Sequence, residues 1–491
     1  MTIPGVRLIH WLSIAILAGA ILMSLEMVAV RLYAPYFGYS IYVWGTTICV
    51  VMGALVAGYA IGGLLADASR AELMLFGAIL IAALWQLLIL GTMRFLLPRL
   101  AQTSEVTGVT LATLIIFAPS MIALAATGPI LVRLCADAGT VGRAAGLVYA
   151  LSTLGSMAGI LVTIFWLLPT AGTETTLRLL CGISFAMGAS GLRSIEHPSR
   201  RKVSIALAIA PIAFLPLLPR LGWSEGSVWT TESAYNLVRV VQHGSQLLLQ
   251  LNHPMSIHTV RDTSGIWTGY YYDSFALGPL LVPTKRALVL GMGAGGSIRS
   301  MRVTAPDVAI DAVEIDPKVI EASTRFFGID AGDRRLRIHV ADARRWLSGN
   351  RGGYDLVQLD VYQGGPYVPF YLVTEEFFRL VRSRMNDHAL MMMNVFDAGR
   401  ETKLLFALAA TLRRVFPCVM VARTDAGNYM LFAFSRSHSV EAIRSRLASV
   451  QLNARLRDLQ IREIAPPAAT PVFTDNVAPV EEITRRMLTG R

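Results

Sequence analysis

The second half of the chain takes its fold from the stretch Arg286-Ala-Leu-Val-Leu-Gly-Met-Gly-Ala-Gly-Gly296. Its first five residues form a compact apolar strand. Gly291, Gly293 and Gly295 then allow a turn in which the backbone can approach a ligand closely. Ser297–Val303 can start a helix directly after the turn. A strand, a glycine turn and a helix in this order predict the first unit of a doubly wound, mostly parallel sheet.

Each of the next three strands expected in this alternation ends in an acidic residue. Ligands of doubly wound sheets bind beyond the carboxyl ends of the strands. The first acid comes 23 residues after Gly291, a separation that suits a carboxylate accepting both hydroxyl hydrogens of a ribose. The turn and the three acids therefore predict a nucleoside-shaped pocket. The strands and acids are Val308–Val313 with Glu314, Arg335–Val340 with Asp342, and Asp355–Leu359 with Asp360.

A small β-rich segment, residues 223–284, is expected to lead into this sheet. Leu237–Gln242 and Ser245–Leu251 are short alternating segments of the kind that form strands. For the tyrosines of Tyr270–Tyr272 we expect a β-strand with ordinary packing, although they could also wall a substrate pocket. Residues 285–491 then form a Rossmann-like catalytic domain.

Residues 1–222 have the composition of a membrane domain. The whole chain is 54% hydrophobic and 16% charged, with a mean hydropathy of +0.52. This first part holds only 13 of the 44 Lys and Arg residues and 7 of the 33 Asp and Glu residues. Because a spanning helix needs about 20 apolar residues, we expect a bundle of about seven helices in the lipid bilayer. The runs are Trp11–Val30, Ile41–Ala66, Leu73–Thr92, Val106–Val132, Gly142–Leu168, Thr175–Leu192 and Val203–Leu218.

Small and charged residues inside these runs indicate how the helices pack. Glu26 lies in an apolar run, where an ionisable group suggests a function, although it could instead pair with Arg31 or a neighbouring helix. Two small-xxx-small pairs let helix backbones approach closely and predict a packed bundle. The pairs are Gly58 with Gly62 and Gly155 with Gly159.

Basic loop residues predict the orientation in a bacterial inner membrane. With seven spans, eight Lys and Arg residues share the side of the N-terminus and five lie on the other side. The cluster Arg200-Arg201-Lys202 contributes most to this difference. The count places the N-terminus inside and the C-terminal domain outside the cytoplasm, and one helix more or fewer reverses that result.

Charge and cysteine usage argue against several other classes. The net charge of +11 divides into +6 for residues 1–222 and +5 for the rest, so we expect no nucleic-acid partner. His253 and His258 lack the spacing of zinc ligands, and we expect no metal. A homo-oligomer is compatible with the sequence. The four cysteines are too far apart in sequence to suggest a disulfide framework; they are Cys49, Cys135, Cys181 and Cys418.

Four segments resemble the spermidine synthase (polyamine aminopropyltransferase) family, which has a class I methyltransferase-like fold, and membrane-fused members of that family. The most diagnostic block is residues 286–378. The segments are Glu232-Ser-Ala-Tyr-Asn236, similar to the first strand of the family; Val313-Glu-Ile-Asp-Pro-Lys-Val-Ile320, similar to its ribose-binding strand; Tyr354-Asp-Leu-Val-Gln-Leu-Asp360 with Pro366, Pro369, Leu372, Thr374 and Glu376-Phe377-Phe378, similar to its core; and Thr474–Glu481, similar to the tail of the fused members.

The resemblance implies transfer of an aminopropyl group from decarboxylated S-adenosylmethionine to an amine such as putrescine. A primary amine is protonated at neutral pH, so a carboxylate must bind the ammonium and take up a proton before the nitrogen attacks. By their matches, Asp360 is the base, although Asp also caps helices and the residue could be a loop acid. The other implied site residues are Gly291, Gly293, Gly295, Glu314 and Asp342 for the donor, and Tyr235, Tyr271, Asp273 and Gln363 for the acceptor.

The chain departs from the family pattern at several charged positions. Ala294 stands where the family has an acid that holds the donor's amine, and Gln363 stands where it has a second acid after the base. Asp273 closes a Tyr-Tyr-Asp segment in place of Tyr-His-Glu, and Ser256 replaces a glutamine. A dication needs carboxylates at both ends, so the acceptor is left open.

Two further functions stay open from the sequence. One is a cofactor-free enzyme outside the cytoplasm that uses Asp360 for amine chemistry on a peptide N-terminus, such as cyclisation of an N-terminal glutamine. The other is an amine sensor or transporter in which the helical bundle responds through Glu26 and Arg31.

Overall fold

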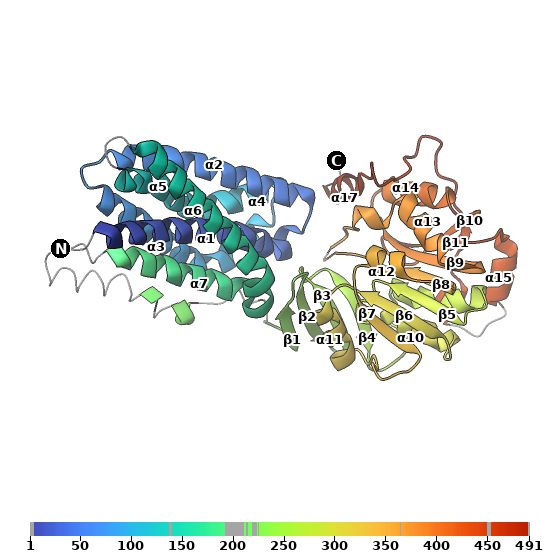
Figure 1. Cartoon of the computed structure of the whole chain (residues 1–491). Coiled ribbons are helices and arrows are strands. Elements are labelled where there is room, and N and C mark those ends of the chain that lie inside the picture. Colours follow the sequence, from blue (N-terminus) through green and yellow to red (C-terminus); the bar gives the residue numbers. More distant parts are fainter. Residues whose placement is uncertain are drawn as a thin grey trace. The chain divides into compact units, whose positions relative to one another are not determined.

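A computed structural model describes residues 4–136, 140–191, 211–212, 215–218, 223, 225–363, 365–448 and 453–489. The chain divides into two compact units, Met1–Glu225 and Gly226–Arg491 (Figure 1). In the described part of the first unit all regular structure is helical, whereas the second unit combines two sheets with helices.

The first unit is a bundle in which helices α1 to α7 pack side by side (Figure 1). Five stretches are long and apolar enough to cross a membrane. The last of them has 50 residues, and Gly172, with φ 79° and ψ 170°, breaks it into two helices. The elements are α1 (Pro4–Phe37), α2 (Ile41–Ala66), α3 (Ala71–Leu100), α4 (Glu105–Ala112), the π-helix η1 (Thr113–Phe117), α5 (Ala118–Cys135), α6 (Val141–Val162), the π-helix η2 (Thr163–Leu167), α7 (Leu168–Ser190) and the short η4 (Leu215–Leu217).

Six of the seven expected spans therefore fall on described helices. The seventh, Val203–Leu218, lies largely outside the described residues, as does the basic cluster Arg200-Arg201-Lys202. Glu26 is 5% exposed in the interior of α1, and its Oε2 has no hydrogen-bond partner among the residues described.

The two glycine pairs are contact points between helix backbones. A Cβ atom added at Gly155 or Gly159 of α6 would collide with a backbone carbonyl oxygen of α1. The same change at Gly58 or Gly62 of α2 would collide with α5. The expected close approach of helices at these pairs is confirmed.

The second unit begins with a four-stranded antiparallel sheet in the order β1-β2-β3-β4. Two of its strands coincide within one residue with those expected from the sequence. After the sheet, residues Tyr271–Leu277 form the 3₁₀ helix η5, and Gly278–Leu281 form the short helix α9. The strands are β1 (Trp229–Glu232), β2 (Leu237–His243), β3 (Gln246–Leu251) and β4 (Ile257–Asp262).

The prediction of a β-strand at Tyr270–Tyr272 is wrong. The carboxylate of Asp273 accepts hydrogen bonds from the backbone N–H groups of Thr268 and Gly269, at 2.9 and 2.7 Å, and from the Thr268 hydroxyl at 2.9 Å. These bonds close the loop and hold the start of a helical turn, so Tyr271 and Tyr272 lie in η5 and Tyr270 precedes it.

The main sheet has eight strands in the order β12-β10-β11-β9-β8-β5-β6-β7. Strands β9, β8, β5, β6 and β7 run parallel to one another, and β11 is antiparallel to both β9 and β10. The chain runs outward from β5 to β7 and then returns to β8 beside β5, which is where a doubly wound sheet binds ligands. The strands are β5 (Arg286–Leu290), β6 (Ala309–Glu314), β7 (Leu336–Val340), β8 (Tyr354–Leu359), β9 (Met385–Phe396), β10 (Cys418–Arg423), β11 (Asn428–Phe434) and β12 (Arg462–Glu463).

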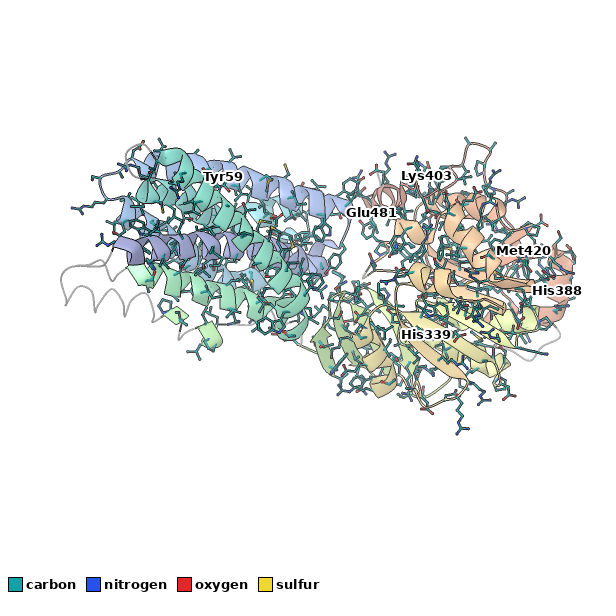
Figure 2. The ribbon with its side chains drawn as sticks, viewed as in Figure 1. Tyr59, His339, His388, Lys403, Met420 and Glu481 are labelled. Atoms are coloured by element: carbon teal, nitrogen blue, oxygen red, sulfur yellow. The ribbon has the colours of Figure 1, made fainter. Side chains whose placement is uncertain are left out.

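Helices cover both faces of this sheet and give it two hydrophobic cores (Figure 1). Leu288 and Leu290 of β5 face one core, whereas Ala287 and Val289 face the other. Met420, labelled in Figure 2, is fully buried in the second core. The helices are α10 (Gly296–Thr304), α11 (Pro317–Phe326), α12 (Ala343–Gly349), η6 (Phe370–Leu372), α13 (Glu375–Ser383), α14 (Lys403–Arg413), α15 (Val440–Ala448), α16 (Ala454–Arg457) and α17 (Val480–Thr489).

Candidate functional site

The glycine turn after β5 has a backbone that only glycine adopts readily. Gly291, Gly293 and Gly295 have φ values of +79°, +52° and +81°. A Cβ at Gly291 would also collide with the carbonyl oxygen of Asp360, because β5 and β8 are neighbours in the sheet. The turn therefore lies directly against the end of β8.

Glu314, the last residue of β6, is tied to this turn. Its Oε2 accepts a hydrogen bond from the backbone N–H of Gly293 at 3.0 Å, and its Oε1 accepts one from Asp316 at 3.1 Å. Burial raises the pKa of the carboxyl from 4.5 to about 7, and the two backbone bonds oppose that rise. Each carboxylate oxygen can accept more than one hydrogen bond, so the group can still bind hydroxyls of a ligand.

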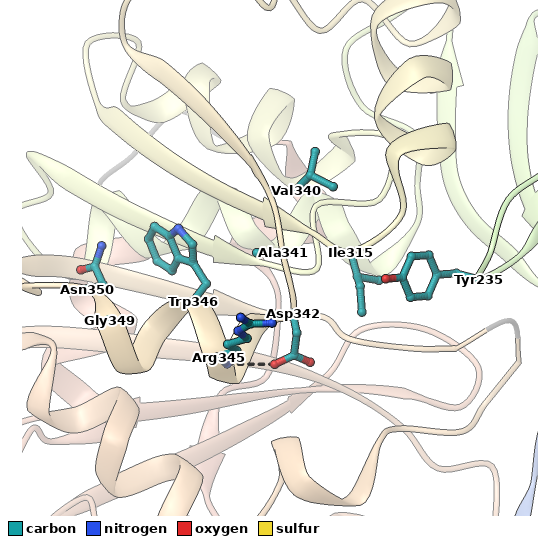
Figure 3. A pocket seen from close by; sticks show the side chains of 9 residues that line it. All are labelled: Tyr235, Ile315, Val340, Ala341, Asp342, Arg345, Trp346, Gly349 and Asn350. Atoms are coloured by element: carbon teal, nitrogen blue, oxygen red, sulfur yellow. Dashed lines mark hydrogen bonds between the residues drawn. The ribbon is translucent and has the colours of Figure 1, made fainter. Parts of the chain in front are cut away.

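Asp342 caps a helix and also lines a cavity. Its Oδ1 accepts a hydrogen bond from the backbone N–H of Arg345 at 2.8 Å, which makes it the N-cap of α12. Its Oδ2 accepts a hydrogen bond from the Tyr371 hydroxyl at 2.9 Å. The cavity has a volume of about 650 Å³, within the range of small-molecule sites, and Tyr235 and Ile315 lie on its wall (Figure 3).

Asp360 follows β8 directly and is half-buried. Its Oδ2 accepts a hydrogen bond from the Tyr271 hydroxyl at 2.8 Å, and its Oδ1 accepts one from Nδ2 of Asn394 at 3.0 Å. Burial raises the pKa of the carboxyl from 3.8 to about 6, and both hydrogen bonds lower it. Asp342 thus caps a helix, whereas Asp360 is held by two side chains from other elements.

The other expected acceptor residues have different surroundings. Asp273 is 4% exposed, accepts the three bonds of its own loop described above, and has a pKa raised by burial. Gln363 is exposed, and its backbone N–H donates to the carbonyl of Tyr367 at 3.1 Å. Ala294 is fully buried, with its N–H donating to the Thr259 hydroxyl at 3.1 Å. Of the expected acceptor residues, Tyr271 is thus hydrogen-bonded to Asp360, and Tyr235 lines the same cavity as Asp342.

Sequence analysis missed two buried amides beside Asp360. Asn394 lies in β9 and is 2% exposed, and Gln358 lies in β8 and is 1% exposed. Both interrupt runs of apolar residues in central strands, and that signal was available in the sequence.

The histidines and acids do not form a metal centre in the part of the chain that the structure describes. There, no group of three or more His, Cys, Asp or Glu side chains could hold a metal ion. His258 lies 2.9 Å from the Ser256 hydroxyl through its Nε2, and burial lowers the pKa of its imidazole to about 4.

The fold and site place the second unit among the class I methyltransferase-like α/β proteins. Residues 277–441 match the Spermine/spermidine synthase domain. The chain is 29% identical over 303 residues to a probable polyamine aminopropyl transferase of Bifidobacterium longum, covering 57% of this chain and 67% of that protein. It is 31% identical over 157 residues to a human eEF1A lysine and N-terminal methyltransferase, covering 30% of this chain and 22% of that protein.

Among solved structures, a probable spermidine synthase from Corynebacterium glutamicum has a TM-score of 0.42 and 19% identity, covering 51% of this chain and 97% of that one. By sequence, residues 277–441 match the Spermine/spermidine synthase domain, and the chain is similar to polyamine aminopropyltransferases. The comparisons favour neither the cofactor-free cyclase nor the amine sensor.

Proposed function

We propose that the second unit is an aminopropyltransferase that uses decarboxylated S-adenosylmethionine and activates the acceptor amine with Asp360. The observation that carries the proposal is the position of this carboxylate. It lies beside the glycine turn, where the strand order of the sheet reverses between β5 and β8. It is held there by hydrogen bonds from Tyr271 and Asn394. A carboxyl with a pKa of about 6 is ionised at neutral pH and can still take up a proton.

The transfer balances without a metal or a redox partner. A bound donor supplies an aminopropyl carbon attached to a positively charged sulfur. Asp360 takes one proton from the acceptor ammonium, which frees the nitrogen lone pair. The new N–C bond then forms as the C–S bond breaks, and the electron pair of that bond stays on sulfur as a neutral thioether. Asp360 finally releases its proton to solvent.

The residues on the donor side suit a nucleoside. The Glu314 carboxylate can accept ribose hydroxyls while the Gly293 N–H holds it in place. Ile315 and Tyr235 line the cavity in which Asp342 lies. Ala294 offers no charge for the amine of the donor, so we expect that amine to be bound less tightly than in relatives with an acid there.

The first unit acts as the membrane domain in this proposal. Its helices α2 and α6 expose large apolar side chains, as expected for helices in contact with lipid. Tyr59 of α2, labelled in Figure 2, is 47% exposed. We place the second unit on the cytoplasmic side of a bacterial inner membrane, because S-adenosylmethionine derivatives are expected in the cytoplasm.

The proposal is tested with the full chain in detergent. Calorimetry measures binding of decarboxylated S-adenosylmethionine and of its thioether product, and mass spectrometry follows alkylation of a panel of amines. We expect donor binding in wild type and in Asp360→Asn, with transfer lowered about 100-fold or more in the variant. If neither the donor nor the thioether product binds, the proposal is refuted.

A further inference from the structure

Two buried amides beside Asp360 have polar atoms without partners. Gln358 is 1% exposed, and neither its Oε1 nor its Nε2 has a hydrogen-bond partner within the described residues. The Oδ1 of Asn394 is unpaired in the same sense, although its Nδ2 donates to Asp360. Buried polar atoms are almost always hydrogen-bonded in proteins, so three unpaired atoms next to one carboxylate need an explanation.

These side chains share one face of the sheet. Alternate residues of a strand point to the same side, so Gln358 lies below Asp360 at a spacing of about 7 Å. Gln358 pairs with Met392 of β9 in the strand register, which brings Asn394, two residues further on, beside Asp360. The three side chains form a polar row that ends at the carboxyl edge of the sheet.

Folding alone does not explain the row. On the same face of the sheet, the neighbours of Gln358 are Leu356 in β8 and, across the sheet, Met392 and Val289. An apolar side chain of similar size would fit these surroundings without leaving polar atoms unpaired. Two of the three unpaired atoms, Oε1 of Gln358 and Oδ1 of Asn394, are hydrogen-bond acceptors. They suit a bound group that supplies hydrogen-bond donors.

The same region holds few free carboxylates. Asp273 is bonded to its own loop, and position 363 is a neutral glutamine. Asp397, after β9, accepts hydrogen bonds from the backbone N–H groups of Gly399 and Leu405. Of the acids discussed here, Asp360 is the one at which a cationic acceptor can be neutralised.

We propose that Asp360, Asn394 and Gln358 bind the head of an acceptor with a single cationic nitrogen, so that the enzyme prefers monoamines to diamines. This inference rests on the proposed function and specifies its substrate class. Three oxygens, one from each side chain, match the three N–H groups of a primary ammonium. One carboxylate matches its single charge. Gln358 is thus a specificity-determining residue.

The test compares n-butylamine with 1,4-diaminobutane as acceptors for the full chain with saturating donor. We expect kcat/KM to favour butylamine by about tenfold or more. In Gln358→Met, the KM for butylamine should rise about tenfold while the KM for donor and the thermal midpoint stay the same or the midpoint rises. Gln358→Glu adds a second carboxylate and should shift the preference toward the diamine.

Gln250→Met is the matched control. Gln250 is a buried glutamine of β3 whose Oε1 also has no partner among the described residues, and it lies in the other sheet. This variant should leave the KM for both amines unchanged.

Two results would overturn the inference and leave the proposed function intact. One is a wild-type preference for the diamine. The other is an acceptor KM that does not change in Gln358→Met. If wild type transfers to neither amine, binding of both amines is measured by calorimetry with the thioether product present. The inference then stands only if butylamine binds more tightly than the diamine and Gln358→Met weakens that binding.

Discussion

At the scale of the residue, the proton affinity of Asp360 is a balance between burial and two hydrogen bonds. The Tyr271 hydroxyl stabilises the ionised carboxylate, so removing it must raise the pKa above about 6. Because the carboxylate is the active form, kcat/KM rises with pH through this pKa. In Tyr271→Phe we expect the acid limb of the profile to move to higher pH by about 0.5–1 unit.

The measurement is kcat/KM for transfer between pH 5 and 9, and Tyr429→Phe in β11 is the control. An acid limb at the same pH in wild type and Tyr271→Phe would mean that the hydrogen bond does not govern the titrating group.

Single site residues could be predicted from the sequence where a local pattern marks them. They could not be predicted where their contacts depend on which strands pair. The positions of Asp360 and Glu314 could be predicted because each comes at the end of an apolar run: Glu314 is the last residue of β6, and Asp360 directly follows β8. The bond from Asn394 to Asp360 depends on the register between β8 and β9, which no local pattern of residues encodes. The capping role of Asp342 has a local signal in the sequence, since an Asp directly before a helix is a common N-cap.

At the scale of the element, the glycine turn couples β5 to the carboxylate at the end of β8. Gly291→Ala adds a Cβ that collides with the backbone of Asp360, at a position where φ is also positive. We expect transfer to fall about 100-fold or more because the base moves. The control is Gly244→Ala in the β2–β3 hairpin, where φ is +59° but nothing lies within 4 Å of the added Cβ.

Both variants carry the strain of a positive φ, about 1–2 kcal/mol, so their difference isolates the collision. Equal activity of the two variants would show that the turn does not position Asp360.

Helix packing in the first unit gives a second prediction at this scale. Gly155→Ala places a methyl group against the carbonyl of Ile16, and we expect it to destabilise the bundle by about 1–3 kcal/mol. Gly146→Ala on the same helix meets nothing within 4 Å and should be neutral or stabilising by up to about 1 kcal/mol. Thermal unfolding of the full chain in detergent compares them, and equal midpoints would contradict the packing role.

The elements themselves were largely predictable. β5 was predicted at its observed bounds and the neighbouring strands within about a residue, because short apolar runs between turn residues carry a strong signal. The tyrosine stretch was misassigned because its conformation depends on the hydrogen bonds of Asp273, the residue that directly follows the three tyrosines. Aromatic residues favour strands on average, and here a capped loop overrides that preference.

At the scale of the whole molecule, the two units give conflicting predictions of the side of the membrane on which the second unit lies. The chemistry that we propose for the second unit needs a sulfonium donor from the cytoplasm, whereas the basic-loop count for seven spans predicts that the second unit lies outside. Six of the expected spans fall on the described helices. The number of crossings decides the side: an even number leaves both ends of the chain on one side, and an odd number separates them.

Reporter fusions after Arg491 decide between these predictions. When fused after Arg491, a reporter that works only in the cytoplasm should be active. A reporter that works only after export should be inactive at the same position. Truncated fusions after Ser40 and Ala68, on either side of α2, should report opposite sides and calibrate the assay, since α2 alone separates them. An exported Arg491 would remove the donor from reach of Glu314 and Asp360. Transfer from a sulfonium would then be untenable, and the amine-activating carboxylate would have to act on a substrate outside the cytoplasm without that donor.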